Sequence, residues 1–175
     1  MKERPIIFSG EMVRAILEGR KTMTRRVIKH PERYSDIREC DFCCPYGQVG
    51  DRLWCRETIC AGCIDFHTVC YRADSSSWPP CEESVTKPSS SMPRWASRIT
   101  LEITGIKVEQ VQEISEADAI KEGTPTEITK YGLTIKYRNL VEAFCELWDD
   151  INFKRGYSWA SNPWVWVISF KVVKP

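Results

Sequence analysis

The stretch Gly19-Arg20-Lys21-Thr22-Met23-Thr24-Arg25-Arg26 places one lysine, two threonines and three arginines directly behind a glycine. It follows an apolar-periodic segment, residues 12–18, and leads into the β-prone pair Val27-Ile28. Surface helices and strands rarely need this mixture, whereas a site for an anionic or carbonyl-bearing ligand does. The stretch is therefore a candidate binding or catalytic site at the boundary between a helix and a strand.

The segment before this stretch is predicted to form a helix over residues 10–18. Ser9 can cap the helix, because its hydroxyl can accept a hydrogen bond from a free amide of the first turn. The apolar face has helical spacing and consists of Met12, Val13, Ile16 and Leu17. Gly19 stands where a left-handed residue commonly ends a helix, so residues 22–28 are predicted to continue as a strand.

The remaining pattern predicts more strands than helices. Residues 99–108 alternate apolar and polar side chains except at Gly105, which indicates a bulge or bend. Other predicted strands are residues 5–8, 51–58, 69–72 and 164–173, and other predicted helices are residues 116–122 and 138–151. Because long helices do not alternate with the strands, we predict an α+β fold, a small mixed β-barrel with short flanking helices.

Length and composition set limits on the class of protein. A chain of 175 residues suits one domain with its own core, spanning residues 1–175. No run of 18 apolar residues predicts a membrane span, and the apolar residues 5–8 are too few for a secretory signal, so a cytoplasmic protein is expected. The net charge of +1 gives no global attraction to nucleic acid, so any such attraction must be local.

Four segments together resemble the ASCH domain superfamily, which is related to the PUA fold. The first is ILEGRKTMTRR at residues 16–26, which is similar to the signature of that superfamily. The others are similar to its phage and prophage-encoded branch: GDRLWCRET at 50–58, MPRWASRI at 92–99 and NPWVWV at 162–167. The resemblance covers most of the chain and is weakest at residues 29–49, 59–91 and 124–137, so insertions are expected at about 29–49 and 59–91.

The resemblance implies a small β-barrel with helices packed around it and a cleft that faces single-stranded RNA or a nucleoside. One bacterial branch of the superfamily removes the acetyl group from N4-acetylcytidine with a lysine, a threonine and a glutamate. These residues fall on Lys21 and Thr24, and on Glu122 in the short helix that follows the long central strand. Ribonuclease activity also occurs among ASCH proteins, so the resemblance alone allows more than one reaction.

The chemistry of these three residues is consistent with that role. A threonine hydroxyl attacks a carbonyl only when a base takes its proton, and a lysine can be that base when burial or nearby positive charge lowers its pKa. Glu122 can protonate the leaving amine. Thr24 and Arg26 share one face of a strand, so Lys21 must lie in the preceding turn, with its nitrogen in hydrogen-bond reach of the Thr24 hydroxyl or one water away. The alternative is that all three are solvated surface residues.

Arginines and a tryptophan are candidates for holding the substrate. Arg26 is the best placed to hold a phosphate or a developing oxyanion. Trp95, beside Arg98 and behind a serine-rich loop, is a candidate for stacking a base, and the alternative is a tryptophan that closes the end of the barrel. The predicted nucleic-acid or substrate-binding set is Arg20, Arg25, Arg26, Trp95 and Arg98, and Tyr157 and Trp159 are further candidates for the same cleft.

Two cysteine pairs have the spacing of a zinc site. Cys40 and Cys43 form one CxxC, Cys60 and Cys63 form another, and 16 residues separate the two. Such a zinc ion would be structural, because four thiolates leave no open coordination position. Alternative ligands are Cys44, His67, Cys70 and Cys81, whereas Cys55 and Cys145 lie on apolar faces and are predicted core residues.

The sequence therefore predicts a protein that acts on RNA or a modified nucleoside. The preferred function is an amidohydrolase for an N4-acylated cytidine-like substrate, with no cofactor needed for catalysis. The alternatives are a single-stranded RNA-binding module without chemistry and a ribonuclease.

Overall fold

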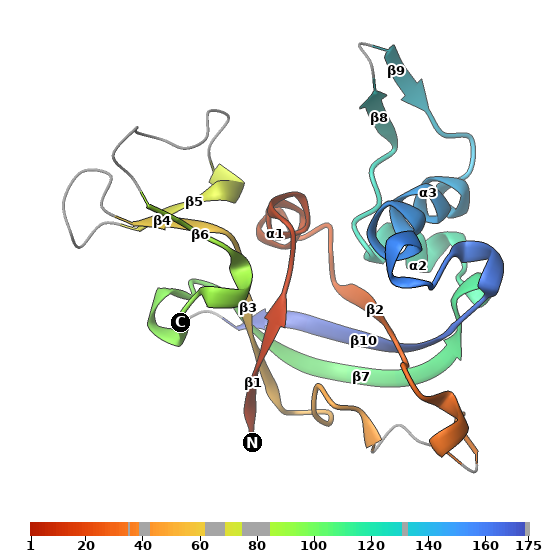
Figure 1. The fold of residues 1–175 in the computed structure, drawn as a ribbon, viewed down its shortest axis with the longest axis horizontal. Helices are drawn as coiled ribbons and strands as arrows, with labels where there is room; N and C mark the ends of the chain where they lie inside the picture. The colour runs from red at the N-terminus through yellow and green to blue at the C-terminus, as the bar shows by residue number, and fades with distance from the viewer. Residues whose placement is uncertain (35, 39–42, 62–68, 75–84, 131–132, 174–175) are drawn as a thin grey trace.

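The structure is a computed structural model that describes the chain except for residues 35, 39–42, 62–68, 75–84, 131–132 and 174–175. Its strands are β1 (Glu3–Ile7), β2 (Met23–Val27), β3 (Arg52–Arg56), β4 (Ile59–Ala61), β5 (Val69–Tyr71), β6 (Val85–Lys87), β7 (Thr100–Gln110), β8 (Glu127–Lys130), β9 (Leu133–Lys136) and β10 (Trp164–Val173). Its α-helices are α1 (Gly10–Leu17), α2 (Glu116–Lys121) and α3 (Leu140–Asn152), joined by short 3-10 turns (Figure 1).

The main sheet has five strands in the order β1-β3-β7-β10-β2. The two longest strands, β7 and β10, pair antiparallel at its centre, and β1 pairs parallel with β3. The register between β7 and β10 shifts between Ser169 and Phe170 of β10, which oppose Gly105 and Ile103 of β7. The predicted irregularity near Gly105 is therefore confirmed. The shift leaves one extra residue on β7 and bends the sheet locally.

The α+β class is confirmed, whereas a closed barrel is not. In the described part of the chain no ladder joins the edge strands β1 and β2, so the five-stranded sheet is open. Figure 1 shows α1 between these two edge strands, both of which lie across β7 and β10. The helix that connects β1 to β2 thus lies between two edge strands that are not paired with each other.

The closing strand β10 is buried on both faces. Trp166 and Ile168 pack into a cluster with Leu53, Leu101 and other residues of the sheet interior and α1. Val165 and Val167 pack on the opposite face, against a second cluster that includes Phe144 and Trp148 of α3. A strand buried on both faces needs apolar residues at every position, which explains the continuous run at residues 164–168.

Two regions contain more structure than the sequence indicated. Residues 59–91 hold a three-stranded sheet in the order β5-β4-β6, of which only β5 was predicted, and residues 75–84 of the expected loop lie outside the described residues. The hairpin β8-β9 forms in the segment 124–137, whose residue pattern predicted neither a helix nor a strand. No helix in the described residues is long and apolar enough to span a membrane.

Candidate functional site

The turn between α1 and β2 places Lys21 at the centre of the site. Gly19 has φ +75° and its amide donates to Ile16 O at 3.0 Å, so it ends α1 in the left-handed conformation predicted for it. The amide of Lys21 donates to Ala15 O at 2.9 Å. Lys21 therefore lies in the turn before β2 begins at Met23, as the strand-parity argument requires.

Lys21 forms a buried ion pair with Glu122. Its Nζ atom donates to Glu122 Oε2 at 2.7 Å and to the backbone oxygen of Glu122 at 2.8 Å. The two residues are only 2% and 4% exposed, and their backbones form an isolated β-bridge. The amide of Thr22 donates to Lys121 O at 2.8 Å, so the end of α2 is attached to the start of β2. Residues about a hundred positions apart thus meet in one site.

Arg25 holds Glu122 from the other side. Its Nη1 atom donates to Glu122 Oε1 at 3.1 Å, while Nε and Nη2 donate to Glu109 Oε1 at 3.0 and 2.6 Å. Nη2 also donates to Asp118 Oδ2 at 3.2 Å. The Arg25 side chain is 1% exposed, so its donors are directed at carboxylates and away from solvent. This arrangement makes Arg25 a residue that positions Glu122.

Thr24 and Arg26 occupy alternate positions of β2 and line the same pocket. Thr24 is 4% exposed. Arg26 donates from Nη2 to Ile7 O at 2.6 Å and lies over the Phe8 ring, with 5.0 Å between guanidinium and ring centre. Arg26 therefore spans the opening between β2 and β1, the two unpaired edges of the sheet.

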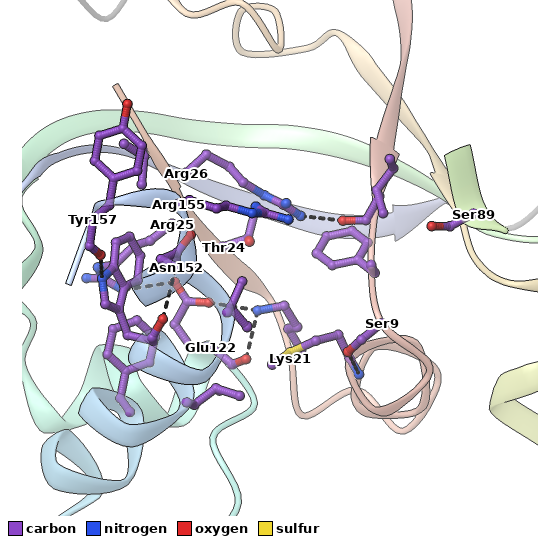
Figure 2. A pocket seen from close by; sticks show the side chains of 18 of the residues that line it. Ser9, Lys21, Thr24, Arg25, Arg26, Ser89, Glu122, Asn152, Arg155 and Tyr157 are labelled. Carbon is purple, nitrogen blue, oxygen red and sulfur yellow. Dashed lines mark hydrogen bonds and ion pairs between the residues drawn. The ribbon is translucent and has the colours of Figure 1, made fainter. Parts of the chain in front are cut away.

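These side chains form one end of a pocket of about 450 Å³ (Figure 2). An apolar part of the lining comes from α3, with Phe144, Leu147, Trp148 and Ile151, and Phe144 adjoins the charged residues, 5.8 Å from the Arg25 guanidinium to its ring centre. The volume is within the range of small-molecule sites, about 300–1,000 Å³. A planar, partly apolar ligand can thus lie against α3 while its polar end reaches the charged residues.

The environment of Lys21 favours loss of its proton. Burial lowers the pKa of Lys21 from its ordinary value, and it outweighs the opposing effect of the Glu122 carboxylate. The positive charges of Arg26 and Arg25 lower this pKa further. Burial also lowers the pKa of the Arg26 guanidinium. The pKa of Lys21 is thus shifted in the direction that a general base requires.

The predicted contact between Lys21 and Thr24 is not a direct hydrogen bond. The hydrogen bonds of Lys21 Nζ within the described structure go to Glu122. Both residues nevertheless line the same pocket, so they are on one side of the sheet opening and not on opposite faces. A link through one water or through a bound ligand stays a prediction.

The remaining predicted binding residues lie outside this pocket. Arg20 is exposed and pairs with Glu18. Trp95, in the 3-10 turn Arg94–Ala96, is 75% exposed, and Arg98 is held by Glu57 and Asp74. The pocket thus gathers Lys21, Thr24, Arg25, Arg26 and Glu122, and it does not gather Arg20, Trp95 or Arg98.

Several lining residues were missed or only suggested by the sequence. Lys29 belongs to the basic run after β2, and Arg155 follows α3 in the turn Phe153–Arg155; both line the pocket. Tyr157 also lines it, as suggested, whereas Trp159 packs edge-on against Phe144 with 6.1 Å between ring centres. Helical periodicity predicted Trp148 and its neighbours as core residues. It does not show that the same side chains also line a pocket.

The zinc prediction falls largely outside the described residues, because Cys40 and Cys63 are not described. Cys43 packs against the main core cluster, and Cys60 is buried in β4 opposite Cys70 of β5. No group of three potential ligands gathers in the part of the chain that is described. Cys55 is a core residue as predicted, and burial raises the pKa of its thiol to about 12.

Comparisons with known proteins identify the fold. No family model and no curated protein matches the chain. Among solved structures it is similar to the ASCH domain from Lactobacillus crispatus JV V101, with a TM-score of 0.50 and 14% identity over 98% of this chain and 79% of that one. A protein from Enterococcus faecalis V583 described by the family model DUF984 has a TM-score of 0.48 and 13% identity over 99% and 76% of the two chains. The first likeness shows the fold: the chain is an α+β protein with an ASCH-like fold.

Gly123 offers a test of how tightly the Lys21–Glu122 pair is packed. Gly123 has φ +75°, and an added Cβ would lie 2.9 Å from Lys21 Cβ and 3.0 Å from Ala15 Cβ. Gly123→Ala is expected to lower the free energy of unfolding by about 2–4 kcal/mol, from backbone strain and overpacking together. Gly156→Ala is the control, because Gly156 has φ +84° but nothing within 4 Å of its Cβ position. Urea denaturation that gives equal losses for both variants would show that the contact with Lys21 is loose.

Proposed function

We propose that the protein is an amidohydrolase that removes the acyl group from an N4-acylated cytidine-like substrate. The observation that carries the proposal is the buried Lys21–Glu122 ion pair, which lines one pocket together with Thr24 (Figure 2). A buried pair of this kind costs desolvation free energy, so a stability role alone is a weak explanation for it. The ASCH-like fold and the motif resemblance at residues 16–26 support the same assignment.

The pair can supply both proton transfers that amide hydrolysis needs. Transfer of one proton from Lys21 to Glu122 along their 2.7 Å hydrogen bond gives a neutral amine and a carboxylic acid. The amine takes the Thr24 proton as Oγ1 forms a bond to the acyl carbon. The carboxylic acid then protonates the departing N4 amine as the C–N bond breaks. The products are an acyl-threonine, cytidine and the original ion pair.

In the second half of the reaction Lys21 is again the base and Glu122 is again the acid. After the internal proton transfer, neutral Lys21 takes a proton from water as the water attacks the ester carbonyl. The Glu122 acid returns a proton to Thr24 Oγ1 as the acyl group leaves. The free acid and the starting enzyme result, so one proton shared by the pair serves both steps.

Hydrolysis of N4-acetylcytidine to cytidine and acetate tests the proposal, with kcat/KM measured from neutral to alkaline pH. The active pair holds one proton, and loss of that proton removes the acid for the leaving amine. Because burial lowers the pKa of Lys21, the alkaline limb of the profile is expected at a pH below its ordinary value of 10.5. Cleavage of single-stranded RNA with the acetyl group intact would favour a ribonuclease, and salt-sensitive RNA binding without products would favour a binding module.

A further inference from the structure

Three cations of the pocket have no carboxylate partner among the described residues. Lys21 and Arg25 are compensated by Glu122, Glu109 and Asp118. Arg26, Lys29 and Arg155 line the same pocket, and no ion pair joins any of them to a described carboxylate. Glu122 is the one carboxylate among the described lining residues, and it is already committed to Lys21 and Arg25. The pocket therefore has an excess of positive charge.

Arg26 is held in place without being neutralised. Its Nη2 atom donates to the neutral Ile7 O, its guanidinium lies over the Phe8 ring, and its buried Nε atom has no hydrogen-bond partner in the described structure. Arg155 is near enough for its charge to lower the pKa of Arg26. Two arginines that repel each other beside a pocket are stabilised by an anion between them.

Lys29 and Arg155 differ from Arg26 in exposure. Both are exposed, whereas Arg26 is half-buried, so these two cations are at the solvent-facing part of the pocket. Arg26 stands two residues from Thr24 on the same face of β2, which separates their Cα atoms by roughly 6.6 Å. An anionic group held at the solvent-facing end by Lys29 and Arg155 would therefore be separated from the acyl carbon that Thr24 attacks by both the base and the ribose of a nucleotide.

We propose that these three cations form a phosphate subsite, so that the protein prefers a nucleotide to the neutral nucleoside as its substrate. Within the proposed function, on which this inference rests for the reaction, the base lies against Phe144 and Trp148 with its N4 group toward Thr24. The ribose lies between the base and Arg26, and the phosphate lies among the side chains of Arg26, Lys29 and Arg155. Arginine suits this role because its planar guanidinium can donate two parallel hydrogen bonds to phosphate. The phosphate belongs either to a free nucleotide or to an RNA strand.

Binding measurements test the subsite independently of catalysis. Isothermal titration is expected to show cytidine 5′-monophosphate binding at least about 10-fold more tightly than cytidine, because only the nucleotide carries the group that the cations recognise. Arg155→Ala is expected to remove most of that difference. Lys154→Ala is the matched control, since Lys154 is the exposed neighbour of Arg155 in the same turn and does not line the pocket. Its preference for the nucleotide should equal that of the unchanged protein.

Each outcome decides a separate question. Equal affinity for nucleoside and nucleotide, or equal losses in Arg155→Ala and Lys154→Ala, would overturn the subsite. A nucleotide preference that depends on Arg155 supports the subsite even when N4-acetylated nucleotides are not hydrolysed, a result that would remove only the proposed function. A short single-stranded RNA that binds more tightly than the monophosphate, with the same dependence on Arg155, identifies the phosphate as part of a strand, and weaker binding identifies a free nucleotide.

Discussion

Replacing Arg25 with methionine is expected to lower the free energy of unfolding by about 3–5 kcal/mol. The substitution keeps an apolar stem of similar length but removes the donors that Arg25 directs at Glu109, Glu122 and Asp118. The Glu109 and Glu122 side chains are 9% and 5% exposed, so water cannot replace those donors at low cost. Two carboxylates then share a poorly solvated region, with Lys107 and Lys21 as their remaining partners.

Urea denaturation at neutral pH measures this loss, and Arg20→Met is the matched control. Arg20 pairs with Glu18 on the surface, where both side chains are about half exposed. Loss of such a pair costs at most about 1 kcal/mol. The double variant Arg25→Met with Glu109→Gln should recover part of the stability, because it removes one of the unpaired charges. Similar losses for Arg25→Met and Arg20→Met would mean that the buried network does not hold α2 to the sheet.

The Arg25 network links stability to the proposed chemistry. Arg25 belongs to β2, Glu109 to β7, and Asp118 and Glu122 to the region of α2, so one guanidinium joins three elements. Arg25 Nη1 donates to Oε1 of Glu122 at 3.1 Å, and Lys21 Nζ donates to Oε2 of the same carboxylate at 2.7 Å. A carboxylate held at both oxygens has one orientation, which is the condition for proton transfer to a defined position.

The elements that could be predicted from sequence are those with local signals. Ser9 does accept a hydrogen bond from the Met12 amide, Gly19 does adopt a positive φ, and Ser115 caps α2 in the same way. Each of these depends only on residues a few positions apart. The long strands β7 and β10 were also predicted, because alternation and apolar runs persist over ten or more residues.

Closure of the sheet could not be predicted, because it depends on residues distant in sequence. In the described structure β1 and β2 are not paired, α1 lies between them in Figure 1, and the Arg26 side chain of β2 donates to Ile7 O of β1. Short strands were missed for a related reason. β4 and β6 have three residues each, over which a period of two gives little signal, although the equally short β5 was predicted.

For the site, sequence could place Lys21 in the turn before β2 and could favour Arg26 as an anion-binding residue, but it could not show that Arg25 holds Glu122. Arg25 and Arg26 are adjacent and chemically identical, yet Arg25 pairs with three carboxylates, whereas no ion pair joins Arg26 to a described carboxylate. The difference comes from Glu109 and Asp118, 84 and 93 positions away. Only the folded chain shows which cation is free for a ligand.

Replacing Thr24 with valine is expected to lower the rate of deacylation at least about 10³-fold while leaving the fold intact. Valine has nearly the same shape, and Thr24 is 4% exposed, so packing changes little while the hydroxyl that attacks the acyl carbon is lost. Thr24→Ser keeps the hydroxyl and should retain much of the activity. Turnover of N4-acetylcytidine measures the rates, and thermal unfolding checks the fold of each variant.

Thr22→Val is the control for this experiment, because Thr22 is an exposed residue two positions earlier that does not line the pocket. Its hydrogen bonds to Lys121 and Phe170 are made by the backbone and survive the change. Full activity in Thr24→Val would mean that water attacks the substrate directly, with the Lys21–Glu122 pair as its base, because the pair remains in that variant. An acyl group trapped on the peptide that contains Thr24, found by mass spectrometry after rapid quenching, would establish the covalent route, since only an attacking hydroxyl can acquire it.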